Sequence, residues 1–300
     1  MKYPINTSAI IDVTKPPYCA DNTGKVDCTE ILRQILDDIL IRQVTELQAT
    51  YDKLIELSDG KKEDAYIGVE GGRVQDGNLN ISYPENEPSN KIIYFPNGTY
   101  LVSDTVTYTL DNLKGFWYWN PKYENCRNIH VLGESREGTV IRLADGSDGF
   151  GAGEEKPLIS FYNNQMDIPR EKGEFTNVAF MNTIEDITID CGKGNDGAVG
   201  IRYISSNCGR IENVTIRAEH SRCGVYVANG AQAVFTNISA CGFDYGFDLE
   251  MPVMMALDDL DVSGCSIAGV YTTASPIKFG RISSGNIPAV KFRDGGRIGR

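Results

Sequence analysis

A short pattern recurs through the C-terminal half of the chain and decides its fold. It reads Ile184-Glu185-Asp186-Ile187-Thr188-Ile189 at its first appearance and Ile211-Glu212-Asn213-Val214-Thr215-Ile216 at its second, and weaker copies begin at Phe235, Leu257 and Phe279. The equivalent apolar positions are 187, 214, 238, 260 and 282, so the spacings are 27, 24, 22 and 22 residues. Such a period, built from short strands without a helix, indicates a solenoid.

Each copy of the pattern is followed by a second strand that opens after a small residue, as in Gly200-Ile201-Arg202-Tyr203 and Gly224-Val225-Tyr226-Val227. We therefore predict an all-β solenoid, a right-handed single-stranded parallel β-helix, with its coils over residues 91–300. A β-sandwich is the alternative, but it does not require a regular two-strand repeat. The predicted interior consists of Ile187, Ile189, Val214, Ile216, Ile238, Leu260, Val262 and Ile282.

The N-terminal part of the chain has a different pattern. Apolar residues at helical spacing predict an α-helix over residues 29–57, begun by Asp27 or Thr29, that caps the open first coil. Residues 58–90 are rich in Gly, Asn and Pro and predict a surface loop insertion with a short hairpin. Residues 1–300 therefore form one predicted domain. Because the repeat is still running at residues 289–292, we expect further coils or a covering partner beyond residue 300.

Composition narrows the function classes. Asp and Glu number 41 against 29 Lys and Arg, a net charge of −12, which argues against a nucleic-acid partner. No apolar run is long enough for a membrane span, and the N-terminus has no signal-peptide pattern. Eight cysteines without a CxxC pair argue against a structural zinc site, two histidines are too few for a multi-histidine metal site, and no metal-ligating residue is predicted. Most of these thiols are expected to be buried, and Cys19 and Cys28 stand close enough for a disulfide in an oxidising compartment.

The outward side chains of the repeat define a candidate site. Because side chains alternate along a strand and coils stack about 4.8 Å apart, equivalent residues form columns on the surface. The predicted columns are Asp186/Asn213/Asn237/Asp259/Arg281, Thr188/Thr215/Ser239/Asp261/Ser283 and Asp190/Arg217/Cys241/Ser263. Carboxylates, hydroxyls and amides in one strip suit a carbohydrate, and Tyr203, Tyr226, Tyr245 and Tyr271 could stack on sugar rings.

From this strip we predict two groups of site residues. Asp186, Asp190, Arg217, Asp259 and Asp261 are the candidate catalytic residues, and Glu219, His220, Asp244, Tyr245 and Asp248 are the candidate substrate-binding residues. The competing interpretation is purely structural, because an exposed sheet face is polar in any case and ladders of Asn, Ser or Thr stabilise solenoids.

Three segments resemble the pectate lyase superfamily, which includes rhamnogalacturonase-like domains and tandem β-helix beta-1,3-glucanases. They are Asp27-Cys28-Thr29-Glu30-Ile31-Leu32, residues 93–102, and Leu132-Gly133-Glu134 with Thr139-Val140-Ile141. The catalytic signatures of the superfamily are not reproduced. Arg281-Ile282-Ser283 is preceded by no Gly-His-Gly, and Thr188-Ile189-Asp190-Cys191 lacks the Trp and His of the calcium-dependent lyases.

The resemblance implies a carbohydrate-active protein that is secreted or periplasmic. We expect a glycoside hydrolase or polysaccharide lyase that acts on a polysaccharide or oligosaccharide in a groove on the outer sheet face. It would require no cofactor as a hydrolase, whereas a lyase could use Ca²⁺. The alternative is a non-catalytic glycan-binding or structural module, similar to a tailspike or adhesin, or one half of a larger enzyme. The sequence leaves the oligomeric state open.

Overall fold

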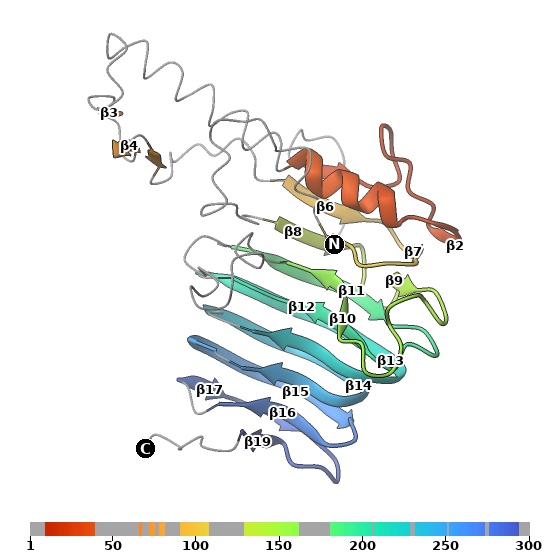
Figure 1. The fold of residues 1–300 in the computed structure, drawn as a ribbon, viewed down its shortest axis with the longest axis vertical. Helices are drawn as coiled ribbons and strands as arrows, with labels where there is room; N and C mark the ends of the chain where they lie inside the picture. Colours follow the sequence, from red (N-terminus) through yellow and green to blue (C-terminus); the bar gives the residue numbers. More distant parts are fainter. Residues whose placement is uncertain are drawn as a thin grey trace.

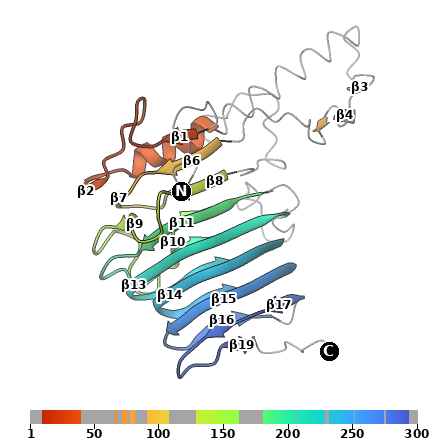
Figure 2. The ribbon, with the colours of Figure 1, turned by 180° about the vertical axis from the view of Figure 1, so that it is seen from behind.

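The chain folds into stacked coils of parallel strands (Figure 1). The computed structural model describes residues 10–39, 66–67, 72–75, 78–81, 91–107, 129–161, 181–205, 207–228, 232–250, 252–273 and 276–293. Views from opposite sides show one coil beneath the next, from the helix and β6 at one end to β17 and β19 at the other (Figures 1 and 2). The predicted parallel β-helix with an N-terminal helix is confirmed.

The strands of successive coils form three parallel faces, which we call A, B and C, and the coils from β8 onwards contribute to all three. Face A contains β1 (Ile10–Asp12), β6 (Lys91–Phe95), β8 (Ile129–Gly133), β17 (Ile277–Phe279) and the first parts of β11 (Thr183–Asp190), β13 (Gly209–Val227), β14 (Gln232–Leu249) and β15 (Met254–Gly264). Face B contains β2 (Thr23–Asp27), β7 (Gly98–Val102), β9 (Thr139–Leu143), β18 (Ile282–Ser283) and the continuations of β11, β13, β14 and β15.

Face C contains β10 (Lys156–Ser160), β12 (Ala198–Arg202), β16 (Ala268–Thr272), β19 (Val290–Phe292) and the last parts of β13 and β14. Three further strands, β3 (Tyr66–Ile67), β4 (Gly72–Gln75) and β5 (Asn78–Ile81), form a separate antiparallel sheet. This sheet lies inside the segment 58–90 that the sequence predicts as a loop with a hairpin, so one more strand is present than a hairpin has.

The repeat register is the one that the sequence predicts. Ile187 pairs with Val214, Val214 with Ile238, Ile238 with Leu260 and Leu260 with Ile282. Seven of the eight predicted interior residues are buried, and Ile282 is half-buried. Ile282 packs against the core at the last described coil, where β18 has a neighbouring strand only on the β15 side.

An α-helix covers the first coil. Its described part runs from residue 29 to residue 39, while the rest of the predicted 29–57 helix lies outside the described residues. Asp27 begins it, because its Oδ1 accepts the Thr29 backbone N–H at 2.8 Å and the Thr29 hydroxyl at 2.6 Å. Leu32, Ile35, Leu36 and Ile39 are buried in the core, so the helix contributes its apolar stripe to the interior.

Cys19 and Cys28, which stand close enough in the sequence for a disulfide, are both free thiols in the structure. Cys28 is buried at the start of the helix, with its Sγ 3.3 Å from the Asp21 carbonyl oxygen, while Cys19 is exposed. The expectation of buried thiols is confirmed for Cys28, Cys191, Cys223 and Cys265.

The core register can be tested by replacing Val214 with Asp. Val214 is fully buried, so an unpaired carboxylate there should lower the free energy of unfolding by roughly 3–5 kcal/mol. Val234→Asp is the matched control, because Val234 is 46% exposed on face A and should change stability by no more than about 1 kcal/mol. Denaturant unfolding measures both variants, and equal losses would contradict the register.

A second prediction concerns the contact between the helix and the coils. The Asp104 carboxylate binds Arg33 Nη2 of the helix at 2.9 Å and Lys156 Nζ of β10 at 2.7 Å. Partial burial alone would raise the pKa of Asp104, but the hydrogen bonds from Lys156 and Arg33 outweigh it and lower the pKa to about 2.

Because the folded pKa lies below the unfolded one, this contribution to stability is present above the ordinary pKa of 3.8 and is lost as the pH falls towards the folded pKa of about 2. Solvent screening limits it to about 1 kcal/mol. Asp104→Asn should therefore be less stable than the parent at neutral pH, and the gap should close in acid. Thermal unfolding along a pH series checks this, and a gap that stays constant down to about pH 2 would contradict it.

Candidate functional site

A row of residues with left-handed backbone conformation separates face A from face B. Asp186, Asn213, Asn237 and Asp259 have φ angles of 55°, 55°, 53° and 52°. Asn and Asp are the side-chain-bearing residues that tolerate this conformation best. Each bends its coil at the same position, so four of the five residues of the first predicted column are bends.

The side chains of this column bind one another from coil to coil. Asn213 Nδ2 donates to Asp186 Oδ1 at 2.5 Å, and Asn237 Nδ2 donates to Asn213 Oδ1 at 2.9 Å. At the far end, Arg281 donates to Asp259 Oδ1 from Nε at 3.0 Å and from Nη2 at 2.8 Å. Asp186, a predicted catalytic residue, thus has one carboxylate oxygen engaged in the ladder.

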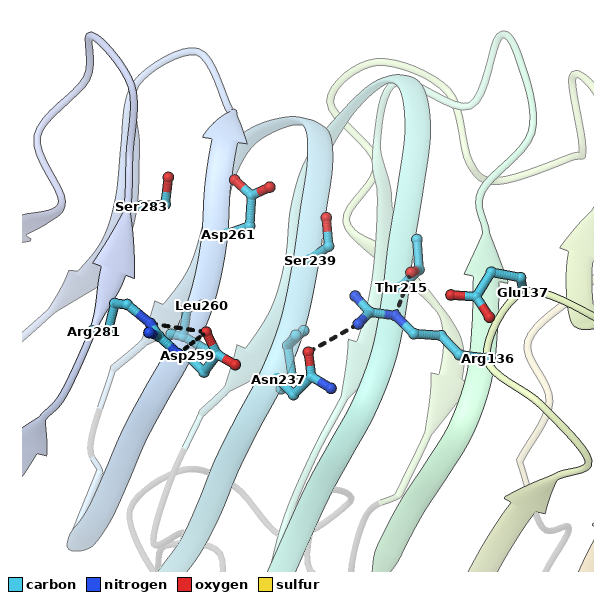
Figure 3. Close-up of a pocket in the computed structure, with 11 residues that line it drawn as sticks. Arg136, Glu137, Thr215, Asn237, Ser239, Asp259, Leu260, Asp261, Arg281 and Ser283 are labelled. Carbon is cyan, nitrogen blue, oxygen red and sulfur yellow. Dashed lines mark hydrogen bonds and ion pairs between the residues drawn. The ribbon is translucent and has the colours of Figure 1, made fainter. Parts of the chain in front are cut away.

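Beside this ladder, an open groove of about 460 Å³ runs across the outer surface of face B (Figure 3). Two parallel rows line it. Thr215, Ser239, Asp261 and Ser283 form one row, and Asn237, Asp259 and Arg281 form the other, with Arg136 and Glu137 at one end. The first row is the second predicted column, whose register Thr188–Thr215–Ser239–Asp261–Ser283 is confirmed. We call this the face B groove.

Arg136 and Glu137 come from the turn between β8 and β9, on an earlier coil than the groove floor. Arg136 Nε donates to Thr215 Oγ1 at 2.8 Å, and its Nη1 donates to Asn237 Oδ1 at 3.0 Å. The guanidinium therefore lies across β13 and β14 and joins the two rows of the groove (Figure 3). Glu137 is exposed beside it.

Two of the predicted catalytic carboxylates lie in the groove. Asp259 is ion-paired with Arg281, which fixes its position at the bend. Asp261 Oδ1 accepts the Ser263 backbone N–H at 3.1 Å and the Ser263 hydroxyl at 2.7 Å, and the side chain is exposed. Their neighbour Asp258 stabilises the turn instead. Backbone N–H groups of Arg281 and Asp259 donate to its Oδ1 and lower the pKa of that carboxyl.

Asp190 and Arg217 lie in the third column, outside the residues that line the groove. Arg217 binds Asp190 Oδ2 through Nε and Nη2, each at 2.9 Å, and Arg142 Nε approaches the same oxygen at 3.9 Å. The predicted end of this column is wrong. A register shift after Ser239 pairs Cys241 with Gly264 rather than with Ser263.

Three predicted substrate-binding residues gather near the turn from face B to face C. His220 Nε2 lies 3.6 Å from Asp244 Oδ1, and the same Asp244 oxygen accepts the Ser266 hydroxyl at 2.7 Å. Glu219 is exposed, with its Oε1 3.9 Å from Lys193 Nζ. This cluster is separate from the residues that line the face B groove.

The remaining two predicted residues lie on face C. Tyr245 stacks on Tyr271, with ring centroids 4.8 Å apart, and Arg293 lies 4.2 Å over the Tyr271 ring. Asp248 is 0% exposed and is bound by Arg222 Nη2 at 2.7 Å and by Arg293. A fully enclosed carboxylate has no surface for a sugar, so Asp248 joins coils instead. Tyr203 is likewise buried, packed against Phe235, and is not available for stacking on a ligand.

Sequence reasoning missed Arg136 and Glu137. They belong to a turn between two predicted strands, Gly133-Glu134-Ser135-Arg136-Glu137-Gly138. Its signal in the sequence is the three charged residues that stand between two glycines. The repeat register does not extend into such turns, so the sequence does not indicate over which coil the turn folds.

The described residues contain no group of three or more His, Cys, Asp or Glu side chains placed to hold a metal ion. No step below involves a metal ion. Within the same part of the chain, no helix is long and apolar enough to cross a membrane.

The chain belongs to the family of rhamnogalacturonase A/epimerase, pectate lyase-like proteins, whose family model matches residues 16–277. Comparison with curated proteins gives no match. Family membership establishes the class of β-helix but does not by itself fix the chemistry.

Proposed function

We propose that the protein binds a polysaccharide along the face B groove and hydrolyses a glycosidic bond there. The observation that carries the proposal is the convergence of Asp259, Asp261 and Glu137 with Arg136 and a row of hydroxyls in one open groove. An open groove on a sheet face suits a long ligand better than an enclosed pocket would, and the family places the chain among pectate lyase-like proteins.

The two rows of the groove supply complementary hydrogen-bonding groups. Thr215, Ser239 and Ser283 offer hydroxyls that donate and accept, Asn237 offers an amide, and Arg136 donates from a fixed position. Sugar hydroxyls need both donors and acceptors, so the floor matches a glycan strand. The main chain beneath is a paired parallel sheet, which holds these groups at the strand spacing of about 4.8 Å.

Hydrolysis needs two carboxyl groups on either side of the scissile bond. In our assignment Asp261 is the acid and gives its proton to the leaving glycosidic oxygen. Asp259, held by Arg281, is the base and takes a proton from the attacking water. The hydroxide bonds to the anomeric carbon as the C–O bond breaks, and one water molecule is consumed for each bond cleaved.

A polysaccharide substrate is consistent with an action outside the cytoplasm, and secretion is part of this proposal. Glycan binding without cleavage is the competing function, and it would use the same groove. Cleavage by elimination would be recognised by an unsaturated sugar in the product, whereas hydrolysis leaves saturated ends.

Asp259→Asn and Asp261→Asn test the assignment. The protein is incubated with polygalacturonate, rhamnogalacturonan and β-1,3-glucan, and new reducing ends and unsaturated products are measured. We expect reducing ends without unsaturation, and a loss of about 10²–10⁴ in kcat for either variant. The melting temperatures should stay close to that of the parent, because Asp261 is exposed and Asp259 is partly so.

Asp148→Asn is the matched control, since Asp148 is exposed and is not among the residues that line the groove. Cleavage that survives in both groove variants would move the catalytic site elsewhere, with Asp190 and Arg217 as the next candidates. Binding of a polysaccharide without any cleavage by the parent protein would favour the non-catalytic function.

A further inference from the structure

The face B groove is blocked at the end where the turn between β8 and β9 covers Thr188. We infer that it receives the end of a glycan chain, so that the protein removes short products from chain ends rather than cutting within the chain. This inference rests on the proposed function and adds to it the mode of attack, which is set by Arg136 and Glu137.

Exposure along one column of equivalent residues shows where the groove stops. Ser283 and Asp261 are exposed, Ser239 and Thr215 are half-buried, and Thr188 on the next coil is only 3% exposed. All five occupy the same position on successive coils of face B. The Thr188 hydroxyl donates to the Arg136 carbonyl oxygen at 2.6 Å, so the covering group is the turn between β8 and β9.

This turn is held firmly enough to act as a wall. Asn97 Oδ1 accepts the Ser135 hydroxyl at 2.8 Å, the Asn97 backbone N–H donates to Glu134 Oε2 at 2.9 Å, and the Gly98 backbone N–H donates to the Gly138 carbonyl at 2.8 Å. A Cβ at Gly133 would lie 2.0 Å from the Asp186 carbonyl oxygen, and one at Gly138 would lie 2.2 Å from Asn97 Oδ1. The turn is therefore tightly packed against Asn97 and the backbone of Asp186.

The wall itself offers groups that can bind a terminal sugar. Two N–H groups of Arg136 are used by Thr215 and Asn237, which fixes the plane of the guanidinium, and its remaining N–H groups have no other acceptor among the described residues. Glu137 places an acceptor beside these donors (Figure 3). A donor and an acceptor side by side suit the adjacent hydroxyls that a chain end exposes.

The position of the carboxylates sets the size of the product. Arg136 lies over β13 and β14, while Asp259 and Asp261 are on β15, one to two strands further along. That separation is about 5–10 Å at the usual strand spacing, which leaves room for about one or two sugar rings between the wall and the scissile bond. The rest of the glycan chain would run along the groove away from Arg136, past Asp261 and towards Ser283.

The experiment uses whichever of polygalacturonate, rhamnogalacturonan and β-1,3-glucan the parent protein cleaves. Product size at low conversion is measured by chromatography, and solution viscosity is followed against reducing-end formation. We expect mono- or disaccharides from the start and little early loss of viscosity. Arg136→Ala should raise KM for short oligosaccharides about tenfold and should release longer products. Arg210→Ala, on the outer side of face A, is the control and should keep the parent pattern.

The outcomes separate the two claims. If the parent releases mixed internal fragments with an early fall in viscosity, chain-end attack is overturned while the proposed hydrolysis stands. If Arg136→Ala keeps both the parent KM and the parent product size, the assignment of the wall to Arg136 is overturned. If no polysaccharide is cleaved, the proposed function fails, and this inference fails with it. The measurement on the parent protein does not depend on the folding of any variant.

Discussion

The left-handed bend between face A and face B is the constraint on which the groove depends. Four consecutive coils place Asp or Asn there, with φ angles near 55°, and the side chains of Asn213 and Asn237 donate to the preceding coil. A bend at the same residue of each coil brings the following strands into register, and this register aligns the outward hydroxyls and carboxylates in rows. The same residues therefore stabilise the solenoid and form one side of the groove.

This double role limits what each residue can contribute to chemistry. Asp186 is the first member of the ladder and accepts from Asn213, whereas Asp259 lies further along the column, where the next coil carries Arg281 rather than an amide. Asp259 has Arg281 as its ion-pair partner and lies on the groove side, next to Asp261 in the adjacent row. The groove thus forms where the regular ladder of amides gives way to charged side chains.

Much of this could be predicted from the sequence because the fold is repetitive. The spacing of positions 187, 214, 238, 260 and 282 predicts the strand register, and two of the three outward columns follow from it. Prediction fails where the repeat is interrupted. The register shift that pairs Cys241 with Gly264 is a local irregularity of β14 and β15 with no sequence signal of its own.

Contacts between residues far apart in the chain also could not be predicted from the sequence. Arg136 reaches Asn237 across 101 residues, and the burial of Asp248 depends on Arg293, 45 residues later. In each case a long side chain outside the repeat reaches another coil, and the periodic pattern carries no information about it. The sequence predicts Asp248 as a polar surface residue. In the structure it is buried, and its ion pairs with Arg222 and Arg293 join neighbouring coils.

The central claim is that the face B groove is the carbohydrate site. Its most direct test is a crystal structure of the Asp261→Asn variant soaked with an oligosaccharide of the polysaccharide that the parent binds. The account predicts sugar density along Thr215, Ser239 and Ser283, with the terminal ring against Arg136. Density on the Tyr245–Tyr271 stack of face C, or beside the Asp190–Arg217 pair with the groove empty, would contradict it.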